Sequence, residues 1–435
     1  MLKKMSMFSL FVLVLIFTAQ TFAAPAVITF LSPETDPSSI KVDNNIIAAF
    51  EKTHPGVQVK LTHANLNDVL PKLSAMLRAG TAPDLAYSSP KFVPPLVDQG
   101  QLVPMDDVFK KLGDIPRKFV TINSKHRIYD IPAAQEVRLL YYRKDLFAAA
   151  GIKPPTTFDE WLKAAKALTL DTNNDGKIDQ YGISITGAPP EVSYDFSCFL
   201  WANGAELFDS KLKVAVDSPK AIEALEFLGK LKEFAPPGVA NTTYKDVSVN
   251  FANGLVAMAV YPGRMLLNID RYNPSLASKV GIVPVPYGPG NNNKKPLTHT
   301  AINNFIIFKT SKNVAAAKEF VTFYMQDKQY LDFLVGSAPG HSLPVRNGWL
   351  NNPDYFAHPA IAKWKDLVKA SMDYSFKYGT DFLFRHPGVV DPYVGRATAD
   401  PVFSREMNRY LAGETTAKQA LTTTADAWRD MFGIK

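Results

Sequence analysis

Apolar and polar positions alternate along the chain with two periods, one typical of strands and one typical of helices. Short apolar runs at 27–31 and 57–62 predict strands, and longer patterned segments at 40–53 and 66–79 predict helices. A third strand is expected within 81–87. Strands that alternate with helices in this order are typical of an α/β sheet covered by helices.

The part of the chain that begins at residue 137 carries several local signals that agree. The apolar run 137–142 predicts a strand, and the short helix expected after it ends at Gly151. Thr157 and Glu160 then have the spacing of a capping box, in which each side chain accepts a hydrogen bond from the backbone N–H of the other residue. A second helix is therefore predicted to begin at Thr157.

The first residues have the pattern of a secretory leader. Lys3 and Lys4 precede an apolar run at 8–17, and small residues follow it, so residues 1–23 are predicted to be a signal peptide cleaved before Ala24. A membrane anchor is the alternative, but the run is too short for about 30 Å of hydrocarbon. The single cysteine, Cys198, lies far from this position, which predicts a chain without a lipid anchor, free in the periplasm.

Composition limits the class of protein further. The chain has 435 residues, of which 46% are hydrophobic and 20% charged, and this length favours two domains. The formal charge is +7, but lysines and arginines are scattered among acids without a basic run, which argues against a nucleic-acid partner. A single cysteine excludes an intramolecular disulfide and a cysteine-based zinc cluster.

Short motifs recur in a familiar order over almost all of the expected mature chain. Residues 50–59 read F-x-x-x-x-P-G-V-x-V and residues 79–84 read A-G-x-A-P-D. Further matching segments lie at 99–106, 139–169, 202–205, 251–258, 284–286 and 315–320. With these motifs the chain resembles the extracellular solute-binding proteins of bacterial ABC sugar importers, the family that includes the maltose and glycerol-phosphate binders.

The resemblance implies a two-lobed periplasmic-binding-protein (Venus flytrap) fold, in which each lobe is a mostly parallel sheet flanked by helices. The chain is expected to cross between the lobes near Ala133, Thr300 and Pro339. The expected N-lobe is 24–133 with 301–337, and the expected C-lobe is 134–300 with 338–435. The resemblance also implies a monomer that captures a carbohydrate between the lobes and delivers it to the permease subunits of an inner-membrane ABC transporter.

Ligand-binding residues are expected in loops after the strands, because ligands of open α/β sheets lie at the carboxyl ends of the strands. A sugar packs its C–H face on an aromatic ring, and its hydroxyls need polar partners. The residues of suitable chemistry in those loops are Ser32, Glu34, Ser88, Ser89, Lys91, Gln135, Glu136, Tyr194, Trp201, Tyr261, Gly263, Arg264, His341, Arg346, Arg385, Tyr393 and Arg396.

One departure from the family pattern changes the expected ligand. Where many relatives have a Gly-Pro-Trp turn, this chain has the segment 261–264, which ends in a cationic Arg264. Together with Lys91 and Arg396, this arginine offers a site for an anionic polyol such as a glycerol phosphate or a sugar acid. A neutral mono- or oligosaccharide is the first expectation, and the anionic polyol is the alternative.

A second motif follows the spacing of a calcium loop. Asp171, Asn173, Asp175 and Asp179 occupy the first, third, fifth and ninth positions, but Gly182 replaces the bidentate glutamate at the twelfth. The alternative is a turn whose side chains cap their own backbone. The sequence leaves open a structural calcium ion and implies no other cofactor.

A secreted glycoside-active enzyme is the competing class of protein. Glycoside hydrolysis needs two carboxylates on opposite sides of the bond, and adjacent acids such as Asp106 and Asp107 cannot supply this arrangement. The serine-hydrolase elbow is also missing, because the segment 182–187 has its second glycine one position too late. The sequence therefore favours a binding protein that is not an enzyme.

Overall fold

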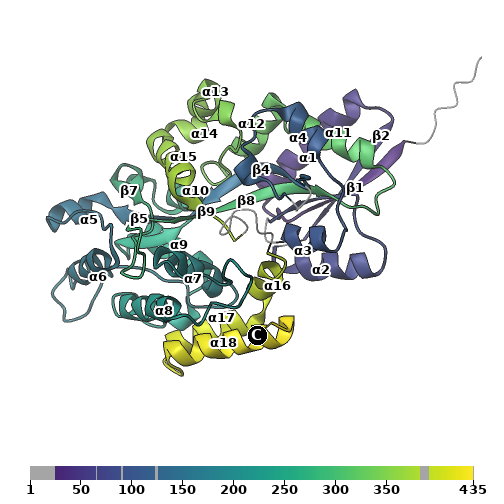
Figure 1. Ribbon diagram of the computed structural model, residues 1–435. Helices are drawn as coiled ribbons and strands as arrows, with labels where there is room; N and C mark the ends of the chain where they lie inside the picture. The colour runs from purple at the N-terminus through teal and green to yellow at the C-terminus, as the bar shows by residue number, and fades with distance from the viewer. Residues whose placement is uncertain (1–24, 65, 90–91, 123–125, 383–390, 435) are drawn as a thin grey trace, which may run out of the picture.

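The described part of the chain contains two separate β-sheets (Figure 1). The structure is a computed structural model that describes residues 25–64, 66–89, 92–122, 126–382 and 391–434, so the predicted leader lies outside the described residues. In the six-stranded sheet the order is β2-β1-β3-β8-β4, and β9 pairs with β8. Its strands are β1 (Ala26–Ser32), β2 (Val57–His63), β3 (Leu85–Ser88), β4 (Ile131–Val137), β8 (Thr298–Ile307) and β9 (Gly379–Thr380).

Helices cover this sheet and bury an aromatic core against it. Phe30 of β1 and Phe305 of β8 pack with Phe50 and Phe320, whose rings meet edge to face with centroids 5.1 Å apart. Phe50 lies on the first helix and Phe320 on α11, so segments distant in sequence share one core. The helices of this part are α1 (Pro37–Thr53), α2 (Leu66–Arg78), α3 (Val93–Asp98), α4 (Asp106–Leu112), α11 (Val314–Tyr324), α12 (Asp327–Gly336) and the 3₁₀ helix η2 (Arg117–Phe119).

The second sheet has three strands in the order β6-β5-β7, namely β6 (Met258–Tyr261), β5 (Leu139–Arg143) and β7 (Val280–Val283). Both pairings are antiparallel, whereas a mostly parallel sheet was expected. Segments that run parallel to β6 pair with it only through single bridges, such as Ser184 to Ala259, and so add no parallel strand to this sheet. The six-stranded sheet is itself mixed, because β8 runs against β3 and β4.

A second aromatic core lies beside the small sheet. Phe158 stacks on Phe227 with ring centroids 3.8 Å apart, and Trp161 stacks on Phe199 at 5.2 Å. The surrounding helices are α5 (Lys144–Ala149), α6 (Phe158–Ala167), α7 (Glu191–Ala202), α8 (Pro219–Lys232), α9 (Tyr244–Ala252), α10 (Arg264–Tyr272), α17 (Pro401–Ala412), α18 (Ala417–Phe432) and the 3₁₀ helices η3 (Val239–Asn241) and η4 (Pro274–Lys279). In Figure 1, α17 and α18 close the lower side of this part.

The chain passes from the large sheet to the small one at Arg138, between β4 and β5, and returns between β7 and β8. The strand predicted at 137–142 is therefore two strands that belong to different sheets. The backbone N–H of Arg138 still donates to the carbonyl of His299 at 2.8 Å, so the pairing with the large sheet extends to the residue at which the chain leaves it. The exact lobe boundaries stay a prediction.

The remaining helices lie between α12 and α17. They are η5 (Asn347–Trp349), α13 (Pro353–Ala357), α14 (Pro359–Ala362), α15 (Lys365–Tyr378) and α16 (Val394–Ala399). Helix α15 packs on strands of both sheets, namely β4, β8 and β9 of the large sheet and β7 of the small one. Among the described helices, none is both long and apolar enough to cross a membrane.

The local signals in the sequence are confirmed. Thr157 accepts from the Glu160 N–H at 3.2 Å, and the Glu160 carboxylate accepts from the Thr157 N–H at 3.2 Å, so the predicted capping box opens α6. Gly151 follows α5 with a φ of 66°, in the left-handed conformation that favours glycine. Residues close in sequence produce both features.

Candidate functional site

A cleft of about 810 Å³ lies between strands and loops of the large sheet and helices beside the small sheet. Its lining comes from the loops after β1 and β3, from β4 and β8, from the beginnings of α7, α9 and α10, and from the segment that joins α16 to α17. The loops after β1 and β3 lie at the carboxyl ends of parallel strands, where the general rule for α/β sheets expects a ligand. A volume of this size accommodates a small ligand.

One side of the cleft is an ion-pair cluster around Arg264, the first residue of α10. Its Nη1 lies 2.8 Å from Oδ2 of Asp36, and its Nη2 lies 3.4 Å from Oε2 of Glu34. Burial opposes the charge of Arg264, but the carboxylates of Glu34, Glu136 and Asp36 outweigh it and raise the pKa of the guanidinium. Since α10 follows β6 of the small sheet while both acids follow β1 of the large sheet, this cluster joins the two sides of the cleft.

Glu136, near the end of β4, forms a second cluster. Its Oε1 lies 3.4 Å from Nε2 of His341 and also accepts from the side-chain amide of Asn303. Burial alone would raise the pKa of Glu136, but His341, Arg264 and the nearby Arg138 hold the pKa well below its usual range. Glu136 is therefore an ionised acceptor in the cleft.

Gly263 explains how the loop of His341 reaches this cluster. A Cβ on Gly263 would lie 1.9 Å from the carbonyl oxygen of Gly340, so only glycine permits this approach of two backbones. The beginning of α10, with Arg264, is thereby packed against the loop that carries His341.

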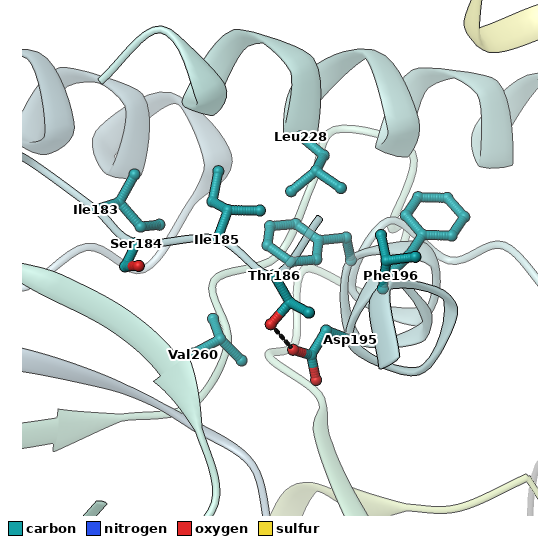
Figure 2. A pocket seen from close by; sticks show the side chains of 10 residues that line it. Ile183, Ser184, Ile185, Thr186, Asp195, Phe196, Leu228 and Val260 are labelled. Atoms are coloured by element: carbon teal, nitrogen blue, oxygen red, sulfur yellow. Dashed lines mark hydrogen bonds between the residues drawn. The ribbon is translucent and has the colours of Figure 1, made fainter. Parts of the chain in front are cut away.

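Arg138 forms the opposite end of the charged network. Its Nε donates to Oδ1 of Asp195 at 3.1 Å, and its guanidinium lies 4.9 Å from the ring centroid of Tyr194. Figure 2 shows the next link, in which the hydroxyl of Thr186 donates to the other oxygen of Asp195 at 2.6 Å. The small cavity beside this link has a volume of about 10 Å³, so it has no room for a ligand.

Aromatic side chains provide the apolar part of the cleft, whose lining includes Tyr87, Phe92, Tyr194 and Tyr244. Tyr244 stacks on Tyr261, with ring centroids 4.4 Å apart and an interplanar angle of 22°. Burial raises the pKa of Tyr261 to about 12 and raises that of Tyr244 as well, so both phenols are neutral. Rings and neutral hydroxyls suit the C–H faces and the oxygens of a polyhydroxylated ligand.

Acids outnumber arginines among the described residues that line the cleft. Each of the two lining arginines is paired with a carboxylate, and His341 faces Glu136. The carboxylates that line the cleft are Glu34, Asp36, Glu136, Glu191 and Asp400. Among the described residues the cleft therefore has no excess of positive charge.

Comparisons with known proteins agree with this architecture. The family model for the bacterial extracellular solute-binding protein matches residues 36–330. The chain belongs to this family. An ABC transporter periplasmic-binding protein of Escherichia coli is 26% identical over 354 residues, which are 79% of this chain and 77% of that protein.

Solved structures of solute-binding proteins share the fold. One from Thermotoga lettingae, bound with α-D-tagatose, has a TM-score of 0.75 and 24% identity, and the match covers 93% of this chain and 99% of that chain. One from Agrobacterium radiobacter, in complex with ribitol, has a TM-score of 0.76 and 24% identity, covering 94% and 99%. The resemblance and the two-lobed fold inferred from the motifs are confirmed.

Not all of the predicted site residues line the cleft of this solute-binding protein. Those that do are Glu34, Ser89, Glu136, Tyr194, Arg264 and His341. Lys91 and Arg385 lie outside the described residues. Ser32, Ser88, Gln135, Trp201, Tyr261, Gly263, Arg346, Tyr393 and Arg396 are described but do not belong to the lining.

Several of these residues have structural contacts behind the cleft. The Ser32 hydroxyl donates to Asp43 at 3.2 Å, and the Ser88 hydroxyl donates to the Ser89 carbonyl at 3.3 Å. The Gln135 amide donates to the Pro344 carbonyl at 2.6 Å. These side chains fix the backbone beside Glu34, Ser89 and Glu136, which line the cleft.

The others contribute to cores or to ion pairs elsewhere. Trp201 is 1% exposed and packs on Phe382. The Tyr393 ring lies 4.8 Å from that of Phe432, and the Arg396 guanidinium lies 5.2 Å from the same ring. Arg346 pairs with Asp114 at 2.9 Å and with Asp327 at 2.8 Å.

Sequence reasoning missed several residues of the lining, notably Asp36, Tyr87, Arg138, Tyr244 and Asn303. Arg138 had a usable signal, because residues two apart on an extended strand share a face and Glu136 was already a candidate. Tyr244 and Asn303 had none, since their places depend on how helix α9 and strand β8 are packed.

The candidate calcium loop is folded as a self-capped turn. Asp171 accepts from the Gly176 N–H at 2.8 Å, Asn173 from the Asp175 N–H at 2.9 Å, and Asp179 from the Thr172 N–H at 2.8 Å. Asp175 in turn accepts from the Lys177 N–H at 2.8 Å. Within the described ranges no group of three or more acidic, histidine or cysteine side chains is placed to hold a metal ion. Calcium binding by this loop stays a prediction.

Proposed function

We propose that this solute-binding protein captures a neutral carbohydrate or polyol in the cleft and delivers it to an ABC importer. The observation that carries the proposal is the pairing of the lining arginines with carboxylates, beside aromatic rings and neutral hydroxyls. A neutral polyol gains hydrogen bonds and ring contacts there without a net charge to balance. The tagatose and ribitol complexes of its structural neighbours support this ligand class.

The anionic polyol stays the alternative, but the contacts of Arg264 and Arg396 in the structure weaken the argument for it from the sequence. Arg264 is engaged by Glu34 and Asp36, and Arg396 stacks on Phe432 outside the lining. An anion would have to displace a carboxylate from Arg264 and would face the remaining acids of the cleft. A neutral ligand meets neither cost.

A binding screen tests the proposal. Thermal unfolding and titration calorimetry should be run with neutral ligands (ribitol, mannitol, D-tagatose, maltose) and with anionic ones (ribonate, mannonate, maltobionate, glycerol 3-phosphate). We expect the largest stabilisation and the tightest binding with a neutral compound, because ligand that binds only the folded state raises its stability. Tighter binding of an anion than of every neutral compound would overturn the proposal.

The mechanism follows from a ligand held between two lobes. A ligand that contacts both sides of the cleft favours the closed arrangement by its difference in affinity between the two states. We expect the radius of gyration from small-angle scattering to fall when the tightest ligand of the screen is saturating. Recovery of the ligand chemically unchanged after prolonged incubation is expected of a carrier, whereas product formation would indicate an enzyme.

The compartment and partners complete the proposal. We expect a chain cleaved before Ala24, without a lipid, that works as a monomer in the periplasm beside the permease subunits. Intact-mass measurement of the protein from its native cells tests this, because a retained Met1 or an added lipid would contradict it. Native mass spectrometry gives the oligomeric state.

A further inference from the structure

Arg138 occupies a place that its neighbours in sequence do not explain. It is the residue at which the chain passes from β4 to β5, and its side chain lines the cleft although it is only 9% exposed. Burial of an arginine is costly unless its charge is balanced and its N–H groups have acceptors. The contacts of Arg138 therefore show which of its N–H groups are engaged by the protein and which are available to a ligand.

Two of its nitrogens have protein acceptors. Nε donates to Asp195 at 3.1 Å, and Nη1 donates to Nδ1 of His299 at 3.3 Å. The plane of the guanidinium is restrained further by the ring of Tyr194, 4.9 Å away. Asp195 is itself fixed by Thr186, as Figure 2 shows, so the guanidinium is held from more than one direction.

The third nitrogen has no such acceptor in the described part of the chain. Among the residues that the structure describes, Nη2 of Arg138 donates no hydrogen bond, while Nε and Nη1 are engaged. A guanidinium presents its N–H groups in one rigid plane, which suits two neighbouring oxygens. A preorganised donor with a neutralised charge is suited to hydroxyl or ring oxygens of an uncharged ligand.

We infer that Arg138 is a specificity-determining residue of the cleft, which donates its remaining N–H groups to oxygens of the ligand, and that Asp195 sets its preference for an uncharged one. This inference rests on the proposed function. It makes a distinct claim, namely that Asp195, a residue behind the cleft that the ligand does not touch, adds to the selection against an acid that the lining carboxylates exert. Asp195 is thus a positioning residue, which acts on the ligand only through Arg138.

The test uses the full mature chain and three pairs of probes, each a neutral compound with its acid: ribitol with ribonate, mannitol with mannonate, and maltose with maltobionate. For the neutral probe that binds tightest, Arg138→Met should weaken binding about tenfold or more, because the donors are lost while the volume is largely kept. Arg138→Lys should also weaken binding, because it keeps the charge but not the planar fork.

Asp195→Asn gives the selectivity readout. It keeps the shape of Asp195, and its Oδ1 can still accept from Nε of Arg138, while its Nδ2 donates to the Thr186 hydroxyl in place of accepting from it. The substitution leaves the charge of Arg138 unbalanced. We expect the ratio of neutral to acid affinity to shift toward the acid by about tenfold. A role in folding alone would not change this ratio.

The matched control is Arg143→Lys. Arg143 is also a buried arginine, paired with Asp145 at 2.7 Å, but it lies outside the lining of the cleft. Its affinities should stay within about twofold of the parent.

The outcomes separate the two claims. If the parent binds a neutral probe and the Arg138 and Asp195 variants keep its affinity and selectivity, the inference is wrong and the proposed function stands. If the parent binds no neutral probe, the proposed function fails and the inference fails with it. Circular dichroism and thermal unfolding establish that each variant is folded, and Arg138→Lys serves where Arg138→Met does not fold.

Discussion

The two arginines of the cleft are paired in different ways. The Arg138 and Asp195 side chains are 9% and 11% exposed, and both lie on the side of the small sheet or at its border. Arg264, 26% exposed, instead reaches across the cleft to Glu34 and Asp36, which are 17% and 56% exposed. Because the pairs of Arg264 join opposite sides of the cleft, we expect them to break when the lobes separate, and we expect the buried pair to keep its partners. One pair should therefore govern stability and the other conformation.

The largest expected effect is on the buried pair. Asp195→Ala leaves Arg138 buried without its carboxylate, which should lower the free energy of unfolding by about 3–5 kcal/mol, measured by urea denaturation at neutral pH. The double variant Arg138→Met with Asp195→Ala should recover much of this loss, because no uncompensated charge remains. A single variant within about 1 kcal/mol of the parent would contradict a structural role for the pair.

The spanning cluster has a buried acid behind it, which gives the second prediction. Asp43 of α1 accepts from the hydroxyl of Ser32 at 3.2 Å and from that of Tyr324 at 2.7 Å. The Ser32 oxygen also accepts from the Glu34 N–H at 3.3 Å, so Asp43 supports the loop that carries Glu34. Burial raises the pKa of Asp43 from 3.8 to about 6, although the hydrogen bond from Tyr324 opposes the shift.

The sign of the effect on stability follows from proton binding. Between about pH 4 and pH 6 the folded state binds more protons at Asp43 than the unfolded state does, so stability falls as the pH rises through this window. A shift of this size corresponds to about 3 kcal/mol. Asp43→Asn should remove this contribution, which urea denaturation at a series of pH values would detect.

Part of the slope should remain in the Asp43 variant. Asp130 is also buried, and burial raises its pKa to about 6 as well, so it contributes with the same sign. Asp130 accepts from the backbone N–H of Thr121 at 2.8 Å and from Asn304 at 2.7 Å. An unchanged pH slope in Asp43→Asn would mean that the Asp43 carboxyl titrates alike in the folded and unfolded states.

Some parts of the fold and of the site could be predicted from the sequence. The capping box of Thr157 and Glu160 and the glycine after α5 could be predicted because their partners lie within four residues. The candidates after β1 could be predicted because strand ends share an edge, and Glu34 does line the cleft. The family motifs predicted the two-lobed fold in which those strand ends face the cleft.

Long-range packing decided the rest. Trp201 was a candidate platform for a sugar, but its ring packs on Phe382, which is far away in sequence. Arg138 was missed although it lies two residues after Glu136, and its partners Asp195 and His299, which lie 57 and 161 residues away, could not be predicted. Arg264 was predicted as a residue that binds an anion, and its partners in the structure are Glu34 and Asp36 from the opposite side of the cleft. The role of each of these side chains depends on the residues that it contacts, and the residue type alone does not predict those contacts.

The smallest expected effect on stability belongs to the spanning cluster. Arg264 and Asp36 are partly exposed, so Arg264→Ala should lower the free energy of unfolding by about 1 kcal/mol or less. Its effect on shape should be clear nonetheless, because an ion pair that exists only in the closed arrangement favours that arrangement in the free protein. The radius of gyration of ligand-free Arg264→Ala should exceed that of the ligand-free parent. High salt should bring the radius of gyration of the parent toward that of the variant, since it screens exposed charges.

Arg429→Ala is the matched control, because Arg429 is 33% exposed and pairs with Asp217 and Asp426 away from the cleft. Identical scattering from Arg264→Ala and the parent would show that the cluster does not hold the lobes together.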